Sequence, residues 1–383
     1  MENSDSALLV FDRRKEDYLQ RKQALFAEYM QRDAQQKELN LFFCLNSSAE
    51  THQLSRNDAA PLSIEDLKNL LTNPFNTYHN GGYLLRWNKK SIVINPTRGF
   101  LERFCELGHH LWDIDAVIVT SPEKSSSHDL ELIHSLNREL NSTLVSYDQE
   151  PHVIRYLLHP VVYAQCGAIL RPHFREEKGT VICLETFQDG YAEEVYALDS
   201  HSKLWYSKRD SSLMIRLELY KEPDQEESPS LSFGYLADSQ WDDTCAAFFK
   251  GCEVLLAGFG KTCPEDLENI KTQTNSIGYW GLSRAAKKLP KLQALLVGEF
   301  CPCQGDIRIA VIKKLKKQIS GRDRQPTLLP LEQGFILDLD TMKINTGTKL
   351  LPPYQFCACD EVHVVQSEES FGPLLYLSKE LVL

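Results

Sequence analysis

The sequence predicts a layered α/β protein, and three observations carry this prediction. Apolar runs typical of strands are interspersed with amphipathic segments typical of helices, without a strict βαβ repeat. The chain has 383 residues, of which 42% are hydrophobic and 25% are charged. That composition is typical of a globular protein, and the length allows one large domain with extensions.

The first part of the chain predicts a helix followed by a strand. Residues 12–37 are rich in Lys, Arg, Glu, Gln and Ala, with apolar residues at helical spacing. We therefore expect residues 1–37 to form an N-terminal helical extension. Residues 39–46 (LNLFFCLN) predict a buried strand, and Ser63 has the position of an N-cap before a further helix.

A compact pattern of alternating elements follows. Two strands, Tyr83–Trp87 and Ser91–Asn95, flank an Asn-Lys-Lys turn. A helix is expected over Gly99–Gly108, a buried strand over Ala116–Thr120 and a helix over Asp129–Leu140.

The second half repeats this mixture. Strands are expected at Thr180–Leu184, Leu213–Leu219, Ser232–Ala237, Val254–Ala257, Ala294–Val297 and Phe335–Leu339. Helices are expected at Trp241–Lys250, Leu282–Leu289 and Ile307–Ile319. The acidic stretch KEPDQEESPS indicates a solvated loop between two strands. We assign residues 38–345 to one domain and residues 346–383 to a C-terminal extension.

The charge balance argues against a protein whose main partner is duplex nucleic acid. The formal net charge is -11, from 53 acidic and 42 basic residues, whereas such proteins usually carry a positive face. Nucleic acid therefore remains a weak expectation. Its best candidate surface consists of Lys287 to Lys291 with Lys313, Lys314, Lys316 and Lys317, which solvated helix faces would also explain.

The 11 cysteines and the N-terminal residues indicate a cytoplasmic protein with reduced thiols. The first residues lack the long apolar run of a secretory signal, and we expect no transmembrane helix and no membrane partner. Two Cys-x-Cys pairs, Cys301 with Cys303 and Cys357 with Cys359, predict either a structural zinc site or free thiols.

Histidines are scarce and rarely clustered. His109 and His110 follow an expected helix and predict C-terminal capping. His128 would either join a noncanonical site or, as a loop histidine, hydrogen-bond to Asp129 or to solvent. Residues 151–174, which contain three histidines, predict a helix and a strand packed on the core or against a partner. The segment GFGKT at 258–262 lacks the first glycine of a phosphate-binding loop.

Several short sequence segments resemble segments found in the metallo-β-lactamase superfamily. DIDAVIVT and the following Asp129-Leu130 resemble the strand and metal-binding loop of that fold. Farther along, FGYLADSQ resembles the strand that supplies a bridging aspartate, here Asp238, and CEVLLAGFG and LQALLVGEF resemble later strands. The phrases occur in the family's order across residues 38–345. The resemblance implies a four-layer αββα sandwich with the N-terminal and C-terminal extensions added.

The same resemblance implies that the metal ligands are largely replaced. Members of the family hold two divalent ions with histidines and carboxylates, which activate a water. Ser121, Glu123, Ser125 and Ser126 fall on the His-x-His-x-Asp-His loop, and Arg209, Asp238 and Glu299 fall on later ligands, with His201 near Arg209. Serine is a poor zinc ligand and arginine repels a cation. We therefore expect no catalytic residues and no cofactor at this vestigial site.

Two alternatives stay open for the remaining carboxylates. Glu123, Asp238 and Glu299 would suit a single Mg²⁺ or Mn²⁺ ion. In the other alternative, Asp238 accepts backbone hydrogen bonds or pairs with Arg209, so that an ion pair fills the site.

Three functions follow from this sequence. The first is an inactive scaffold or regulatory subunit that binds a protein partner or a second copy of itself. The resemblance implies a setting in a bacterial antiviral-defence or signalling complex. The second is a metal-dependent hydrolase, a phosphodiesterase or nuclease, with a noncanonical site. The third is a binder of a small anionic, nucleotide-like ligand that Arg209 or Lys208 contacts.

Overall fold

The computed structural model describes most of the central part of the chain. The described residues are 39–45, 81–107, 109–146, 149–170, 180–185, 194–222, 228–260, 276–300, 308–319, 325–331, 334–346, 363–365 and 374–376. The helices expected over residues 12–37 and after Ser63 lie outside them. In the described part of the chain, no helix is long and apolar enough to cross a membrane.

One sheet has ten strands. In spatial order these are β16 (His363–Val365), β17 (Leu374–Tyr376), β15 (Ile344–Thr346), β14 (Phe335–Asp338), β1 (Leu41–Cys44), β2 (Tyr83–Trp87), β3 (Lys90–Ile94), β4 (Ala116–Val119), β5 (Arg155–Leu158) and β6 (Val181–Cys183). Strands β3 to β6 are parallel, and their near-continuous apolar sequences suit burial on both faces.

The other sheet has seven strands. In spatial order these are β13 (Thr327–Pro330), β12 (Ala294–Phe300), β11 (Val254–Gly260), β10 (Leu231–Leu236), β9 (Ser212–Leu219), β8 (Ser202–Arg209) and β7 (Glu194–Asp199). Strands β10 to β13 are parallel, whereas β7, β8 and β9 form antiparallel pairs.

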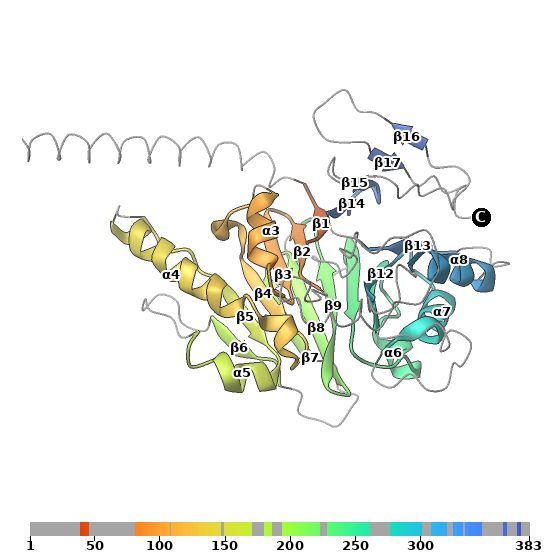
Figure 1. Cartoon of the computed structure of the whole chain (residues 1–383), viewed down its shortest axis with the longest axis horizontal. Coiled ribbons are helices and arrows are strands. Elements are labelled where there is room, and N and C mark those ends of the chain that lie inside the picture. The colour runs from red at the N-terminus through yellow and green to blue at the C-terminus, as the bar shows by residue number, and fades with distance from the viewer. Residues whose placement is uncertain are drawn as a thin grey trace, which may run out of the picture.

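Helices cover the outer face of each sheet, so the molecule has four layers, α, β, β and α (Figure 1). Beside the ten-stranded sheet lie α3 (Phe100–Glu106), α4 (Leu130–Ser146) and α5 (Pro160–Cys166), with short 3₁₀ helices η4 (Leu111–Asp113) and η5 (Lys124–Ser127). Beside the seven-stranded sheet lie α6 (Asp243–Phe248), α7 (Gly278–Lys288) and α8 (Arg308–Ile319). The αββα architecture expected from the sequence is confirmed.

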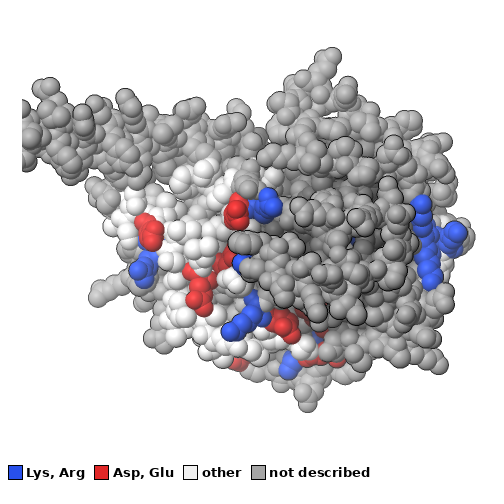
Figure 2. Space-filling view, in the orientation of Figure 1, with Lys and Arg blue, Asp and Glu red and all other residues white. Residues whose placement is uncertain are grey.

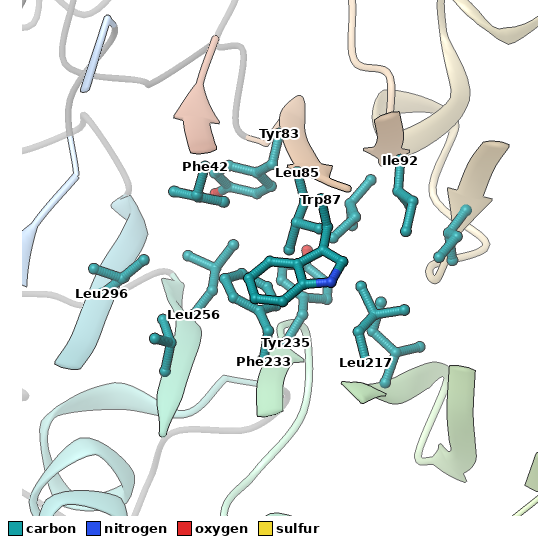
Figure 3. Close-up of a cluster of buried hydrophobic side chains, with 14 of the residues drawn as sticks. Phe42, Tyr83, Leu85, Trp87, Ile92, Leu217, Phe233, Tyr235, Leu256 and Leu296 are labelled. Carbon is teal, nitrogen blue, oxygen red and sulfur yellow. The ribbon is translucent and has the colours of Figure 1, made fainter. Parts of the chain in front are cut away.

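The largest apolar core lies between the two sheets. Side chains of both sheets point toward one another there, with Trp87 near the centre (Figure 3). The ring of Phe42 lies 5.8 Å from that of Tyr83 in its own sheet and 5.4 Å from that of Phe233 in the other. The indole Nε1 of Trp87 donates a 2.9 Å hydrogen bond to the Tyr220 carbonyl, so the one polar atom of this side chain is satisfied.

Two further cores lie between each sheet and its helices. The one under α3 contains a buried polar pair, because Nη2 of Arg86 lies 3.1 Å from Nδ1 of His109. Burial, followed by the charge of Arg86, lowers the pKa of His109 to about 4. The expected capping by the His109 side chain is therefore wrong, and the backbone amide of His109 bonds to the Phe104 carbonyl instead.

Most expected elements are present, and the differences are local. The hairpin of β7 and β8 was not expected, because its residues alternate polar and apolar too irregularly to stand out. Residues 151–170 do form a strand and a helix, β5 and α5. Two strands of the C-terminal extension, β16 and β17, continue the ten-stranded sheet through β15.

Gly234 supplies a test of the packing between β10 and α6. A Cβ atom there would lie 2.7 Å from Cδ1 of Phe249 and 3.0 Å from Cδ1 of Leu255. We expect Gly234→Ala to lower the free energy of unfolding by about 1–3 kcal/mol, because a packed core resists added volume. Gly251→Ala is the matched control, because nothing lies within 4 Å of its Cβ position. Urea denaturation measures both, and equal losses would show that β10 and α6 are not closely packed.

Candidate functional site

The ends of strands from both sheets meet at one edge of the sandwich. Asn95 directly follows β3, and Thr120 directly follows β4. The amide of Leu213, in β9 of the other sheet, donates a 2.8 Å hydrogen bond to the Thr120 carbonyl. In mixed α/β sheets the carboxyl ends of parallel strands are the usual location of sites, and several sequence-predicted positions lie here.

A chain of hydrogen bonds crosses between the sheets at this edge. Asn95 receives a 2.8 Å bond from the Thr120 amide, and its Nδ2 donates to the Tyr235 hydroxyl at 2.8 Å. The Tyr235 hydroxyl donates in turn to Oε1 of Glu299 at 2.8 Å. The hydroxyl of Tyr83 donates to the same oxygen at 3.2 Å. Tyr83 and Asn95 belong to one sheet, and Tyr235 and Glu299 to the other.

Glycines make room for this network. Gly258 and Gly298 are directly paired across β11 and β12. A Cβ atom at Gly258 would lie 2.6 Å from Oε2 of Glu299, and one at Gly298 would lie 2.9 Å from the Tyr83 hydroxyl. Both glycines are therefore needed for the carboxyl and the phenol to lie where they do.

Three polar residues at this edge have left-handed backbone conformations. The φ angles are 50° at Asn95, 51° at Asp238 and 56° at Glu299. Asn and Asp adopt this region readily, but a glutamate there costs roughly 1–2 kcal/mol. The two tyrosine hydrogen bonds offset part of that cost, and strain of this kind tends to accumulate at functional sites.

The environment of Glu299 favours its neutral form. Burial, followed by the nearby charge of Asp238, raises the pKa of Glu299 to about 8, although the hydrogen bonds from Tyr235 and Tyr83 act in the opposite direction. Burial and the charge of Glu299 also raise the pKa of Tyr83 and of Tyr235 well above the ordinary value, so both hydroxyls stay protonated.

Arg209 ends β8 beside this edge and pairs with Asp242. Nη2 of Arg209 lies 2.7 Å from Oδ2 of Asp242. The other oxygen, Oδ1, caps α6 by accepting hydrogen bonds from the amides of Thr244 and Cys245. Burial acts to raise the pKa of Asp242, but these hydrogen bonds and the charge of Arg209 prevail and lower it. The guanidinium expected near Asp238 thus forms its ion pair with a different aspartate.

The loop after β4 carries four sequence-predicted positions. Ser121 and Ser126 are buried, whereas Glu123 and Ser125 are exposed. Oγ of Ser121 accepts a 3.3 Å hydrogen bond from the amide of Glu123, which precedes η5. His128 is exposed, and its Nδ1 lies 3.5 Å from Oδ1 of Asp129. This position agrees with a loop histidine that interacts with Asp129.

His159 is not among the sequence-predicted site residues, yet it lies beside this edge. It directly follows β5 and caps α5, with its Nδ1 accepting a 3.2 Å hydrogen bond from the Val161 amide. Burial lowers the pKa of His159, and the charge of Lys208 lowers it further. The end of β8, which carries Lys208 and Arg209, therefore lies close to the end of β5.

The residues at this edge do not fit the two-metal centre that the resemblance implies. Across the described ranges, no group of three or more His, Cys, Asp or Glu side chains lies together. The alternative set of Glu123, Asp238 and Glu299 is therefore not brought together in the described part of the chain. The remaining mapped positions offer serine hydroxyls and an arginine, which are unsuited to a cation. The four cysteines expected for structural zinc lie outside the described residues.

Some of the residues that sequence reasoning missed do carry a partial signal. Asp242 precedes α6 as an N-cap aspartate, a pattern that is visible in the sequence. Asn95 stands where the family has the aspartate of its Asp-Pro-Gly-like turn. Tyr83 and Tyr235 carry no signal, because a buried strand accommodates tyrosine without any functional reason.

Comparisons with known proteins identify the fold. No family model and no curated protein matches the sequence. The metallo-β-lactamase fold protein YhfI from Bacillus subtilis matches in structure with a TM-score of 0.52 and 12% identity, over 77% of this chain and 97% of that one. A long form RNase Z from yeast matches with a TM-score of 0.51 and 10% identity, over 80% of this chain and 42% of that one. The chain therefore has the fold of the metallo-β-lactamase superfamily, as its sequence phrases indicated.

The raised pKa of Glu299 predicts how stability depends on pH. Because the folded-state pKa is about 8 and the ordinary value is 4.5, the folded state binds the proton more tightly. Stability is then greatest below the ordinary pKa and falls as the pH rises toward 8. Glu299→Gln keeps an oxygen acceptor for both tyrosines and cannot ionise. We expect it to flatten this decline.

Chemical denaturation at several pH values between 5 and 8 measures the effect. Glu123→Gln is the matched control, since Glu123 is an exposed carboxylate at another mapped position, and it should leave the pH profile unchanged. A Glu299→Gln profile that still declines as steeply as the wild type would refute the assignment.

Proposed function

We propose that this metallo-β-lactamase-fold chain is a scaffold or regulatory subunit that binds a protein partner and does not hydrolyse a substrate with a two-metal centre. One observation carries the proposal. At the edge where the family holds its metals, the mapped side chains bond to one another or to their neighbours. Glu299 accepts from Tyr83 and Tyr235, and Arg209 pairs with Asp242.

The chemistry of these groups supports binding over hydrolysis. Metal-assisted hydrolysis needs cations to lower the pKa of a bound water. The Glu299 carboxyl already accepts hydrogen bonds from the hydroxyls of Tyr83 and Tyr235. The buried hydroxyl of Ser121 and the guanidinium of Arg209 add no cation affinity.

An exposed apolar surface supports a protein partner. Helix α5 begins at the same edge of the sandwich, directly after His159. On and just after it, Val161 is 43% exposed, Tyr163 40% and Ile169 54%. Exposed apolar side chains often mark protein interfaces where they form one patch, and we propose that this segment contributes to such a patch. The partner would be another protein or a second copy of this chain, and a role in defence or signalling remains part of the proposal.

A second candidate is a hydrolase with a noncanonical site. Asp238 and Glu299 are close enough for the aspartate charge to raise the pKa of the glutamate, and both have left-handed φ angles. Two coupled carboxyls of this kind are also found where acid–base chemistry occurs. Under this alternative, Asp238→Ala abolishes hydrolysis.

Metal content and hydrolysis separate the two candidates. We expect the purified full chain to retain less than one zinc per chain at this edge. We also expect it to release nitrophenol from bis(p-nitrophenyl) phosphate no faster than the Asp238→Ala variant does. One zinc that is lost when Cys301, Cys303, Cys357 and Cys359 become Ser would indicate the cysteine site and leave the proposal standing. Two zinc ions that persist in that variant, with activity lost in Asp238→Ala, would overturn it.

The α5 surface is tested by affinity capture from a lysate of the source organism. We expect a Val161→Ser, Tyr163→Ser double variant to lose the chains captured by the wild type, because it removes exposed apolar area. Val195→Ser is the matched control, since Val195 is 53% exposed on β7, in the other sheet. Equal capture by wild type and double variant would exclude this surface.

A further inference from the structure

The outer helices of the seven-stranded sheet carry a basic surface. Neither residues 276–298 nor residues 308–319 contain an acidic residue. In Figure 2, Lys and Arg side chains gather at the edge of the molecule where Figure 1 draws α8. We name this surface the α7–α8 basic face, and its members are Arg284, Lys287, Lys288, Lys291, Lys313, Lys314, Lys316 and Lys317.

The two helices are held together, so their charges form one surface. The hydroxyl of Tyr279 in α7 donates a 3.0 Å hydrogen bond to the Lys314 carbonyl in α8. Apolar residues such as Leu282 and Leu315 are fully buried beneath. The inner faces of both helices therefore fix their position, and the lysines remain on the outer side.

Ordinary surface helices interleave opposite charges, because like charges four residues apart repel by a few tenths of a kcal/mol. Here such pairs occur within the helices, at Arg284 with Lys288 in α7 and at Lys313 with Lys317 in α8. Lys288 has an ion pair with Asp243 of α6. An anionic ligand would account for so many like charges on one face of a chain of net charge -11.

An aromatic platform lies on the same face. The guanidinium carbon of Arg284 lies 3.7 Å from the ring centre of Trp280, which is partly exposed. Positions 280, 284, 287 and 288 share one side of a helix because they are separated by three or four residues. This side of α7 thus begins with the stacked Trp280 and Arg284 side chains and continues with about one basic residue per helical turn.

From this arrangement we infer that the α7–α8 basic face binds a single-stranded polynucleotide. The lysines would contact successive phosphates, and a base would stack against the Trp280–Arg284 pair. An acidic protein segment would match the charge equally but gains little from the aromatic stack, which is why a polynucleotide is favoured. The inference is independent of the proposed function, since the face lies on the outer helices rather than at the strand-end edge.

Fluorescence anisotropy with a labelled mixed-sequence 20-nucleotide single-stranded DNA tests the inference, using the full chain at several NaCl concentrations. We expect Lys313→Gln with Lys317→Gln to weaken binding and to lower the salt slope by roughly 1.4, because each phosphate neutralised on a single strand contributes about 0.7. Lys89→Gln with Lys124→Gln, which removes two exposed lysines near the other sheet, should change the binding only slightly. Circular dichroism melting verifies that all variants are folded.

The aromatic contribution has its own readout. Trp280→Ala should weaken binding roughly tenfold, as for the removal of one base stack, with an unchanged salt slope, and Trp280→Phe should restore most of the affinity. No binding in 50 mM NaCl, or equal weakening in the two lysine double variants, would overturn the inference. The inference would also be overturned if Trp280→Ala bound the DNA with unchanged affinity and poly-L-glutamate displaced the DNA as well as unlabelled single-stranded DNA does. That outcome would indicate an acidic protein partner.

Discussion

The face-to-face packing of the two sheets is the constraint on which the rest of this molecule depends. Phe42 and Phe233 contact each other across the interface, and the surrounding apolar side chains exclude water from both inner faces. Close packing of this kind fixes the sheets relative to each other. The ends of β3, β4, β10 and β12 therefore meet at one edge. Side chains far apart in sequence, such as Asn95 and Tyr235, can then share a hydrogen bond.

At that edge, the polar residues and their neighbours depend on one another. A glutamate at position 299 must be accommodated by Gly258, because a Cβ there would overlap its carboxyl. Its left-handed backbone and its burial both cost free energy, which the hydroxyls of Tyr83 and Tyr235 offset. Tyr235 in turn needs Asn95 as a donor. This mutual dependence is typical of a polar network that orders its surroundings.

The sequence was sufficient for the layers but not for the contacts between them. Apolar runs such as Ala116–Val119 predicted buried parallel strands because both faces of such strands are covered. The hairpin of β7 and β8 was not predicted, because its polar and apolar residues alternate irregularly. The resemblance mapped ligand positions one by one, but it did not indicate their partners, since Arg209 pairs with Asp242 and not with Asp238. That pairing depends on how the end of β8 approaches α6, which the spacing of residues along the chain does not encode.

The inner and outer residues of α7 and α8 are under different constraints. Packing dictates the inner residues of α7 and α8, since Leu282, Ala285 and Leu315 must fill the space above the sheet. It places no demand on the sign of the charges outside, where Glu and Lys have similar helix propensities. If the charged residues of this acidic chain were distributed at random, both acidic and basic residues would occur on the outer sides of these helices. The helix dipole favours the lysines in the last turns, Lys287, Lys288, Lys316 and Lys317. Neither packing nor the dipole requires that acidic residues be absent from the rest of both helices, and the inferred ligand would account for that absence.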